Sequence, residues 1–338
     1  MFTGPVSIQM ITDQPEAVLN LLSIRKTQMT LRQVDWQPVL ESEGYRRLKQ
    51  REIGMGTPFT DLVFQGFLMT RDLLIRSDAL AEALEQWKLV DLQMPLNRAL
   101  AYLPVNTHIQ ARIYPVIKPK TNSFVFEPDT NPAIFIYLNP DVNNARFTNT
   151  LTHELHHIGS ANAEHSLKQA PYWQTLAESQ RAALEWVGAF GEGMAMLAAA
   201  GGPDVHPHLL SGEEERARWD MDLEHFNQDL PILERFFLDV LDGKLQGKDV
   251  FTAGFEFFGI QGPWYTVGWQ MATLIEKYTG RQNLITCFYN PWRLLAEYNM
   301  VVARYNQETL NPLAQWSETL LEKLSVGLPE KIISVEME

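Results

Sequence analysis

Three short segments rich in β-branched and aromatic residues interrupt a sequence whose hydrophobic pattern is otherwise helical. They lie between residues 109 and 139, read IQARIYPVIK, SFVFE and AIFIYLN, and are separated by turn-forming residues. The sequence before about residue 104 and after Asp141 follows the helical period instead. The pattern predicts an α+β fold that is mainly α, in which the three segments form a small antiparallel sheet.

The same change of pattern suggests how the chain is divided. We expect a helical N-terminal lobe over residues 1–105, and a second part over 106–338 that holds the sheet and a helical C-terminal region. No stretch has the composition of a flexible linker, so the two parts could also form one continuous domain. Long helices are expected around 171–200, 213–243, 264–279, 291–306 and 312–326.

Charge and cysteine content narrow the classes of function. The chain has 28 basic and 41 acidic side chains, a formal charge of −13, which repels phosphate backbones and anionic membranes. We therefore expect neither nucleic acid nor a membrane as a partner. The N-terminal sequence lacks a basic region followed by an apolar one, so we expect a cytoplasmic protein. The single cysteine, Cys287, cannot form a thiolate cluster, so any metal must be held by His, Asp or Glu.

The segment TNTLTHELHHIG, residues 148–159, has the spacing of a metal-binding helix. At 100° per residue, His153 and His157 lie about 40° apart on one face, opposite the apolar Leu151, Leu155 and Ile158. Two imidazoles one turn apart can bind one tetrahedral cation, and Glu154 can reach a water on that cation without being a ligand. We expect Gly159 to end this helix.

A catalytic zinc ion needs a third protein ligand. The metzincin pattern HExxHxxGxxH is excluded, because Ser160 and Ala163 stand where it requires Gly and His. Glu164 and His165 lie about two helical turns beyond His157, too far along a straight helix to share its ion.

The segment AALEWVGAFGEGMAMLAAAGG, residues 182–202, offers a better third ligand. It reads as a buried helix in which Glu185 and Glu192 are the only charges. A carboxylate in apolar surroundings is costly unless it is paired or binds a metal, so we expect one to be a ligand and the other to accept from an imidazole N–H. Glu192 is the preferred ligand, because small residues flank it and let another helix approach closely. Glu185 is the alternative ligand. If neither glutamate binds a metal, we expect both to form salt bridges with arginines elsewhere in the chain.

With HELHH followed by Glu192-Gly193-Met194-Ala195, the chain resembles the gluzincin-type zinc metallopeptidases, and it is most similar to uncharacterised bacterial zinc-dependent peptidases. The resemblance rests on residues 131–200 and more weakly on 262–276. It implies a zincin-like core, one Zn²⁺ per chain held by His153, His157 and Glu192, and Glu154 as the general base. It also implies a peptide or protein substrate, which could add as a strand to AIFIYLN if that strand lies at a sheet edge; a central buried strand fits the segment equally well.

The stretch GPWYTVGWQMATLIEKYTG, residues 262–280, contains a candidate donor for the oxyanion. It is similar to a Tyr-x-x-Gly-x-x-Met stretch of related peptidases, and it would place Tyr265 in the catalytic site, although a tyrosine packed between helices fits as well. For the isolated His206, His208 and His225 we expect ordinary structural roles.

The function predicted from the sequence is zinc-dependent hydrolysis of peptide bonds. One alternative is a metal-binding module without catalytic activity, although it would not require Glu154. A carboxylate-bridged di-iron protein is the other, since Glu154-x-x-His157 matches one of its elements, but the sequence lacks the second Glu-x-x-His that such sites need.

Overall fold

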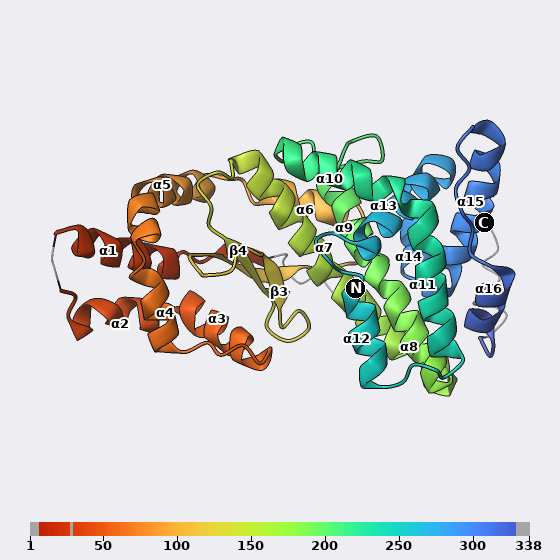
Figure 1. Ribbon diagram of the computed structural model, residues 1–338, viewed down its shortest axis with the longest axis horizontal. Helices are drawn as coiled ribbons and strands as arrows, with labels where there is room; N and C mark the ends of the chain where they lie inside the picture. Colours follow the sequence, from red (N-terminus) through yellow and green to blue (C-terminus); the bar gives the residue numbers. More distant parts are fainter. Residues whose placement is uncertain (1–6, 28–29, 329–338) are drawn as a thin grey trace. The chain divides into compact units, whose positions relative to one another are not determined.

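The computed structural model describes residues 7–27 and 30–328 (Figure 1). The chain packs into two compact units: Met1–Asn97 with His108–Gly159, and Arg98–Thr107 with Ser160–Glu338. The predicted division into residues 1–105 and 106–338 stays a prediction. The expectation of a mainly helical α+β protein agrees with the structure.

The first unit contains a four-stranded sheet in the order β1-β2-β4-β3. Its strands are β1 (Ser7–Met10), β2 (Gln110–Val116), β3 (Phe124–Phe126) and β4 (Ala133–Tyr137). β2 runs parallel to both β1 and β4, with Ile113 beside Ile134, and only β3 runs antiparallel to its neighbour. The sheet is therefore mixed, and the prediction of an antiparallel sheet was wrong.

The parallel strands β2 and β4 are largely buried. Most of β2 and nearly all of β4 are buried, which is typical of parallel strands covered on both faces. β4 lies between β2 and β3 and is hydrogen-bonded on both sides. Of the two alternatives for the segment AIFIYLN, an edge strand or a central buried strand, the structure therefore has the central strand. Its backbone groups are already paired, and a peptide cannot add to it as a further strand.

The helices that precede β2 in the sequence include some that pack directly against this strand. Gln14 shows how α1 is fixed to β2: its amide donates to the carbonyl oxygen of Ile117 at 2.9 Å, and its oxygen accepts from the Ile117 N–H at 3.0 Å. These helices are α1 (Asp13–Thr27), α2 (Gln33–Glu41), α3 (Glu43–Gly54), α4 (Asp61–Leu68), α5 (Arg71–Lys88) and α6 (Gln93–Leu100).

Helix α7 (Asn144–Lys168) carries the HExxH motif and is longer than the sequence suggested. It begins where the Asn143 side chain accepts a hydrogen bond from the N–H of Arg146 at 2.9 Å. It continues past Gly159 for more than two turns, so the prediction that Gly159 ends it was wrong. A glycine inside a helix costs only about 1 kcal/mol, which the buried residues on either side offset. The predicted core face is confirmed, because Leu151, Leu155 and Ile158 are fully buried.

The second unit is a bundle of helices. The single helix predicted over 182–202 is divided into α8 (Glu178–Val187), a 3₁₀ turn η2 (Gly188–Phe190) and α9 (Gly191–Ala200). Gly201, in the left-handed conformation with φ 89°, ends α9. The helix predicted over 213–243 is likewise two helices that meet at His225. The other elements are η1 (Pro171–Thr175), α10 (Glu213–Glu224), α11 (Phe226–Leu241), α12 (Lys248–Glu256), α13 (Pro263–Thr279), α14 (Arg281–Phe288), α15 (Pro291–Glu308) and α16 (Glu318–Ser325).

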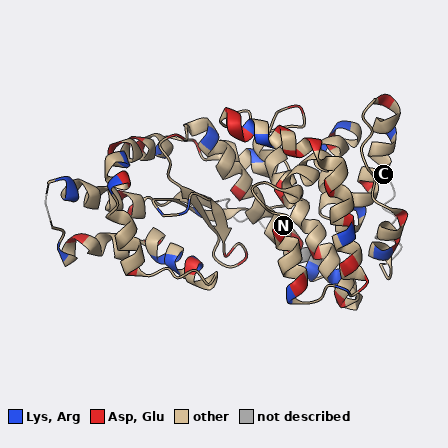
Figure 2. Ribbon diagram, in the orientation of Figure 1, with Lys and Arg blue, Asp and Glu red and all other residues tan. Residues whose placement is uncertain are grey.

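Charged side chains are spread over the helices of both units, with acidic and basic residues interspersed (Figure 2). The acidic run Glu213–Glu215 occupies the first turn of α10, where carboxylates favour the positive end of the helix dipole. Of the helices in the described part of the chain, none is long and apolar enough to cross a membrane.

Candidate metal centre

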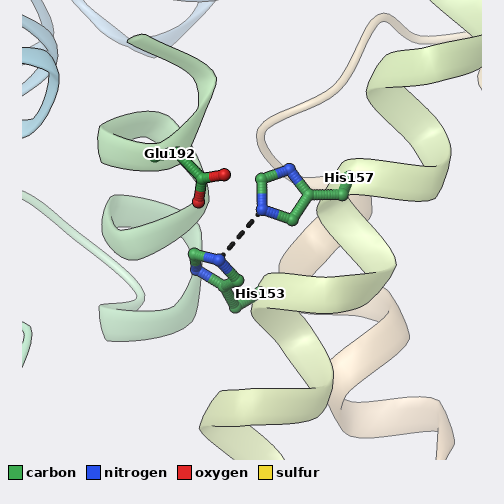
Figure 3. Close-up of side chains that lie close together, drawn as sticks. All are labelled: His153, His157 and Glu192. Carbon is green, nitrogen blue, oxygen red and sulfur yellow. Dashed lines mark hydrogen bonds between the residues drawn. The ribbon is translucent and has the colours of Figure 1, made fainter. Parts of the chain in front are cut away.

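Two histidines of α7 form the base of the site. His153 and His157 are one helical turn apart, and their Nε2 atoms approach to 2.9 Å (Figure 3). The rings meet edge to face, with an interplanar angle of 84° and centroids 4.6 Å apart. Both side chains are half-buried, whereas the opposite face of the helix is in the core. The two nitrogens are therefore directed at one position beside α7.

Glu192 is the third member of the group. It lies in the first turn of α9, and its carboxylate points toward the two imidazole rings (Figure 3). The potential ligand atoms of His153, His157 and Glu192 all lie within 4.8 Å of one another. Within residues 7–27 and 30–328, this is the one group of three or more His, Cys, Asp or Glu residues that is close enough to hold an ion.

The donor set fits zinc. Two imidazole nitrogens and one carboxylate oxygen are typical ligands of catalytic zinc, and three protein ligands leave the fourth tetrahedral position for reacting groups. Zinc–nitrogen bonds of about 2.0–2.1 Å with tetrahedral angles place two donor atoms about 3.3 Å apart. The observed 2.9 Å between the histidine nitrogens is within a few tenths of an ångström of that spacing. Small changes of side-chain torsion would therefore accommodate the ion.

A crossing of two helices fixes the backbone next to Glu192. A Cβ atom added to Gly193 would stand 2.0 Å from the backbone nitrogen of Trp269, and one added to Gly268 would stand 2.7 Å from the carbonyl oxygen of Phe190. The backbones of α9 and α13 are thus in direct contact. The sequence predicted that the small residues beside Glu192 let another helix approach closely. At Gly193 the helix that approaches is α13.

Glu154 follows the first histidine on α7. Its side chain is only 7% exposed, and it is not a member of the three-residue group. A carboxylate that adjoins the ligands without being one is in keeping with the general base expected from HExxH. That role stays a prediction.

Glu185, the alternative ligand, has a different environment from the one expected. Its carboxylate is 48% exposed and lies 3.5 Å from the ammonium group of Lys168. The ion pair and contact with solvent stabilise this carboxylate, whereas the sequence suggested that a metal ion or an imidazole N–H would stabilise it. The break at η2 explains the difference, because Glu185 and Glu192 belong to two separate helices.

The other candidates lie in distinct surroundings. Tyr265 is in the first turn of α13, half-buried, with its ring edge-on to Phe258 at 6.5 Å, and its role as an oxyanion donor stays a prediction. His165 is exposed and contacts Gln169 at 2.7 Å. Of the three isolated histidines, His206 contacts Asp220 through its Nε2 at 2.9 Å, and the ring of His208 lies 5.1 Å from that of Trp219. His225 lies between α10 and α11.

Sequence reasoning missed Tyr289, which follows α14. Its hydroxyl group is 2.7 Å from the Oγ of Ser160, the residue one turn beyond His157 on α7. Burial raises the pKa of Tyr289 well above its ordinary value, so the phenol is neutral. Ser160 could have been found, because it continues the histidine face of α7, but nothing local marks a tyrosine 129 positions away.

Comparison with known proteins places the chain in a family. A family model described as "putative zinc dependent peptidase (DUF5700)" matches residues 36–307, which include α7 and α9. No curated protein and no solved structure matches the chain. The match begins at residue 36, so the helices between 36 and 105, which contributed nothing to the resemblance seen in the sequence, are part of what the family shares. Because the match covers most of its length, the chain belongs to the family that this description names.

Proposed function

We propose that this protein is a gluzincin-type zinc metallopeptidase that hydrolyses peptide bonds. The convergence of His153, His157 and Glu192 within 4.8 Å carries the proposal, because these donors from two helices match the HExxH and downstream glutamate of gluzincins. The family supports the broader class of zinc-dependent peptidase. One ion per chain would follow from the single group of donors in the described residues.

The reaction requires a Lewis acid and a base. His153, His157 and Glu192 would hold the zinc ion, which would polarise the peptide carbonyl and lower the pKa of water. A carboxylate oxygen of Glu154 accepts a proton from the attacking water, whose oxygen forms a bond to the carbonyl carbon. Glu154 then donates this proton to the nitrogen of the leaving amine as the carbon–nitrogen bond breaks. The burial of Glu154 suits both steps, because a carboxylate shielded from bulk water exchanges its proton with the substrate.

Substitution of the base separates catalysis from metal binding. In Glu154→Gln the side chain keeps its size but cannot accept a proton, so zinc content should be unchanged while hydrolysis of a casein or fluorogenic peptide substrate falls at least about 100-fold. Glu178→Gln is the matched control, because Glu178 is an exposed carboxylate at the start of α8. Full activity of Glu154→Gln would refute the mechanism.

The same experiment addresses the alternative of a metal-binding module without activity. That alternative predicts zinc binding but no hydrolysis by the unsubstituted chain across a broad peptide library. Two metal ions per chain, with iron displacing zinc, would instead favour the di-iron class.

A further inference from the structure

A partly enclosed cavity lies within the second unit, beside the C-terminal part of α7. Its walls are mainly apolar and aromatic, and three charged side chains reach it. The cavity encloses about 420 Å³ including its open mouth. The residues that matter for its chemistry are Trp173, Phe288, Tyr289, Glu164, Glu185 and Lys168.

The cavity continues the face of α7 that holds the metal ligands. Residues 153, 157, 160 and 164 follow one another at helical spacing on that face. Tyr289 lines the cavity and contacts Ser160, one turn beyond His157, and the α7 residues that line the cavity begin at Ala163. Glu164 lies seven residues beyond His157, about 10 Å along the helix. An extended peptide covers that distance with about three residues.

The charges of the cavity suit a cation. Glu185 already has one, since the ammonium group of Lys168 lies 3.5 Å from its carboxylate. Both side chains are almost half exposed, at 48% for Glu185 and 44% for Lys168, and such ion pairs contribute only about 0–1 kcal/mol. Another ammonium group can therefore replace Lys168 at little cost.

The walls of the cavity suit a side chain with an apolar stem and a charged end. Methylene groups pack well against aromatic walls such as Trp173 and Phe288, while a charged end stays with the carboxylates. A lysine side chain has both features.

We propose that this cavity is a specificity subsite that binds a lysine side chain of the peptide substrate. The substrate ammonium group replaces that of Lys168 beside Glu185 and Glu164, and the methylene stem lies against the aromatic wall. This inference rests on the proposed peptidase function, and it adds a substrate class to it. The acidic chain, with its formal charge of −13, also favours the approach of basic peptides.

Hydrolysis of matched peptides tests the subsite. One lysine is moved through the three positions on each side of the cleaved bond, and norleucine is its uncharged control. At one position, lysine should raise kcat/KM about fivefold over norleucine, which is the upper limit for ion pairs of this exposure. In Glu164→Gln and Glu185→Gln this ratio should fall below about twofold. Glu178→Gln, an exposed carboxylate of α8 outside the cavity, should keep the full ratio.

A binding measurement keeps this test separate from the test of catalysis. Fluorescence anisotropy of the labelled lysine and norleucine peptides is measured with the Glu154→Gln variant, with and without Glu164→Gln. Tighter binding of the lysine peptide that is lost in Glu164→Gln supports the subsite even if no peptide is hydrolysed. Equal binding of the two peptides, or equal cleavage at every position, overturns the subsite and leaves the peptidase proposal standing.

Discussion

Gly193 and Gly268 lie against each other where α9 crosses α13, so close that neither position has room for a Cβ atom. Gly193 directly follows Glu192, so this crossing fixes the backbone that carries the third metal ligand. Helix packing thus requires a glycine at position 193, and metal binding would require a carboxylate at the adjacent position 192.

The first prediction concerns this crossing. Gly193→Ala places a methyl group 2.0 Å from the backbone nitrogen of Trp269, which cannot move without displacing α13. We expect it to lower the free energy of unfolding by at least about 3 kcal/mol, measured by urea denaturation, and to weaken zinc binding.

Gly191→Ala is the matched control, because the nearest atom to its added Cβ is a ring carbon of Phe288 at 3.6 Å, an ordinary contact. It should unfold within about 1 kcal/mol of the unsubstituted protein. Similar destabilisation by the two substitutions would show that the helix crossing does not carry the effect.

Removal of the metal should destabilise the protein. A ligand that binds only the native state stabilises it by about 2.7 kcal/mol at a free concentration 100 times its Kd. Dialysis against a chelator should therefore lower Tm by roughly 4 °C, and added zinc should restore it. In Glu192→Gln, which lacks the anionic ligand, the chelator should change Tm much less; an equal change in both proteins would place the metal elsewhere.

Lys118 gives the first unit a pH dependence of its own. Its side chain is only 3% exposed, and burial lowers its pKa to about 7, although it donates to the carbonyl oxygen of Lys120 and the Oδ1 of Asn122. Between pH 7 and about 10 the unfolded chain keeps the proton that the folded protein has lost. The free energy of unfolding should therefore rise with pH in this window, by at most about 1.4 kcal/mol per unit.

The substitution Lys118→Met isolates this contribution. Methionine keeps the apolar stem and removes the titrating group, so its unfolding free energy should rise less between pH 7 and 9 than that of the unsubstituted protein. Lys120→Met, at a position whose side chain is 60% exposed, should keep the original slope. Parallel slopes for the unsubstituted protein and Lys118→Met would contradict the lowered pKa.

Local patterns predicted the features that depend on neighbours in the sequence. The two-faced helix of His153 and His157, and the three strands between 110 and 137, follow from periodicity and residue type, and the structure contains them. β1 was not predicted, because its four residues form a strand only by pairing with residues more than 100 positions away. The parallel course of β2 and β4 has the same origin, since strand direction depends on the path of the chain between them.

The site shows the same limit. Glu192 could be chosen because a carboxylate among apolar and small residues is costly unless it is paired or binds a metal. Its position beside the histidines agrees with that choice. Glu185 is also a lone carboxylate among apolar residues in the sequence, yet it pairs with Lys168 in the wall of the cavity. The turn η2, which separates the two glutamates, has no signature beyond one glycine and an alanine, so tertiary packing alone distinguishes them.

Anomalous scattering from crystals of the zinc-loaded protein, recorded on both sides of the zinc absorption edge, tests the central claim most directly. We predict one peak per chain, about 2.0–2.2 Å from a ring nitrogen of His153, a ring nitrogen of His157 and a carboxylate oxygen of Glu192. A peak bound by Glu185 in place of Glu192 would contradict the assignment of the third ligand. The absence of any peak on the two histidines would contradict the metal centre itself.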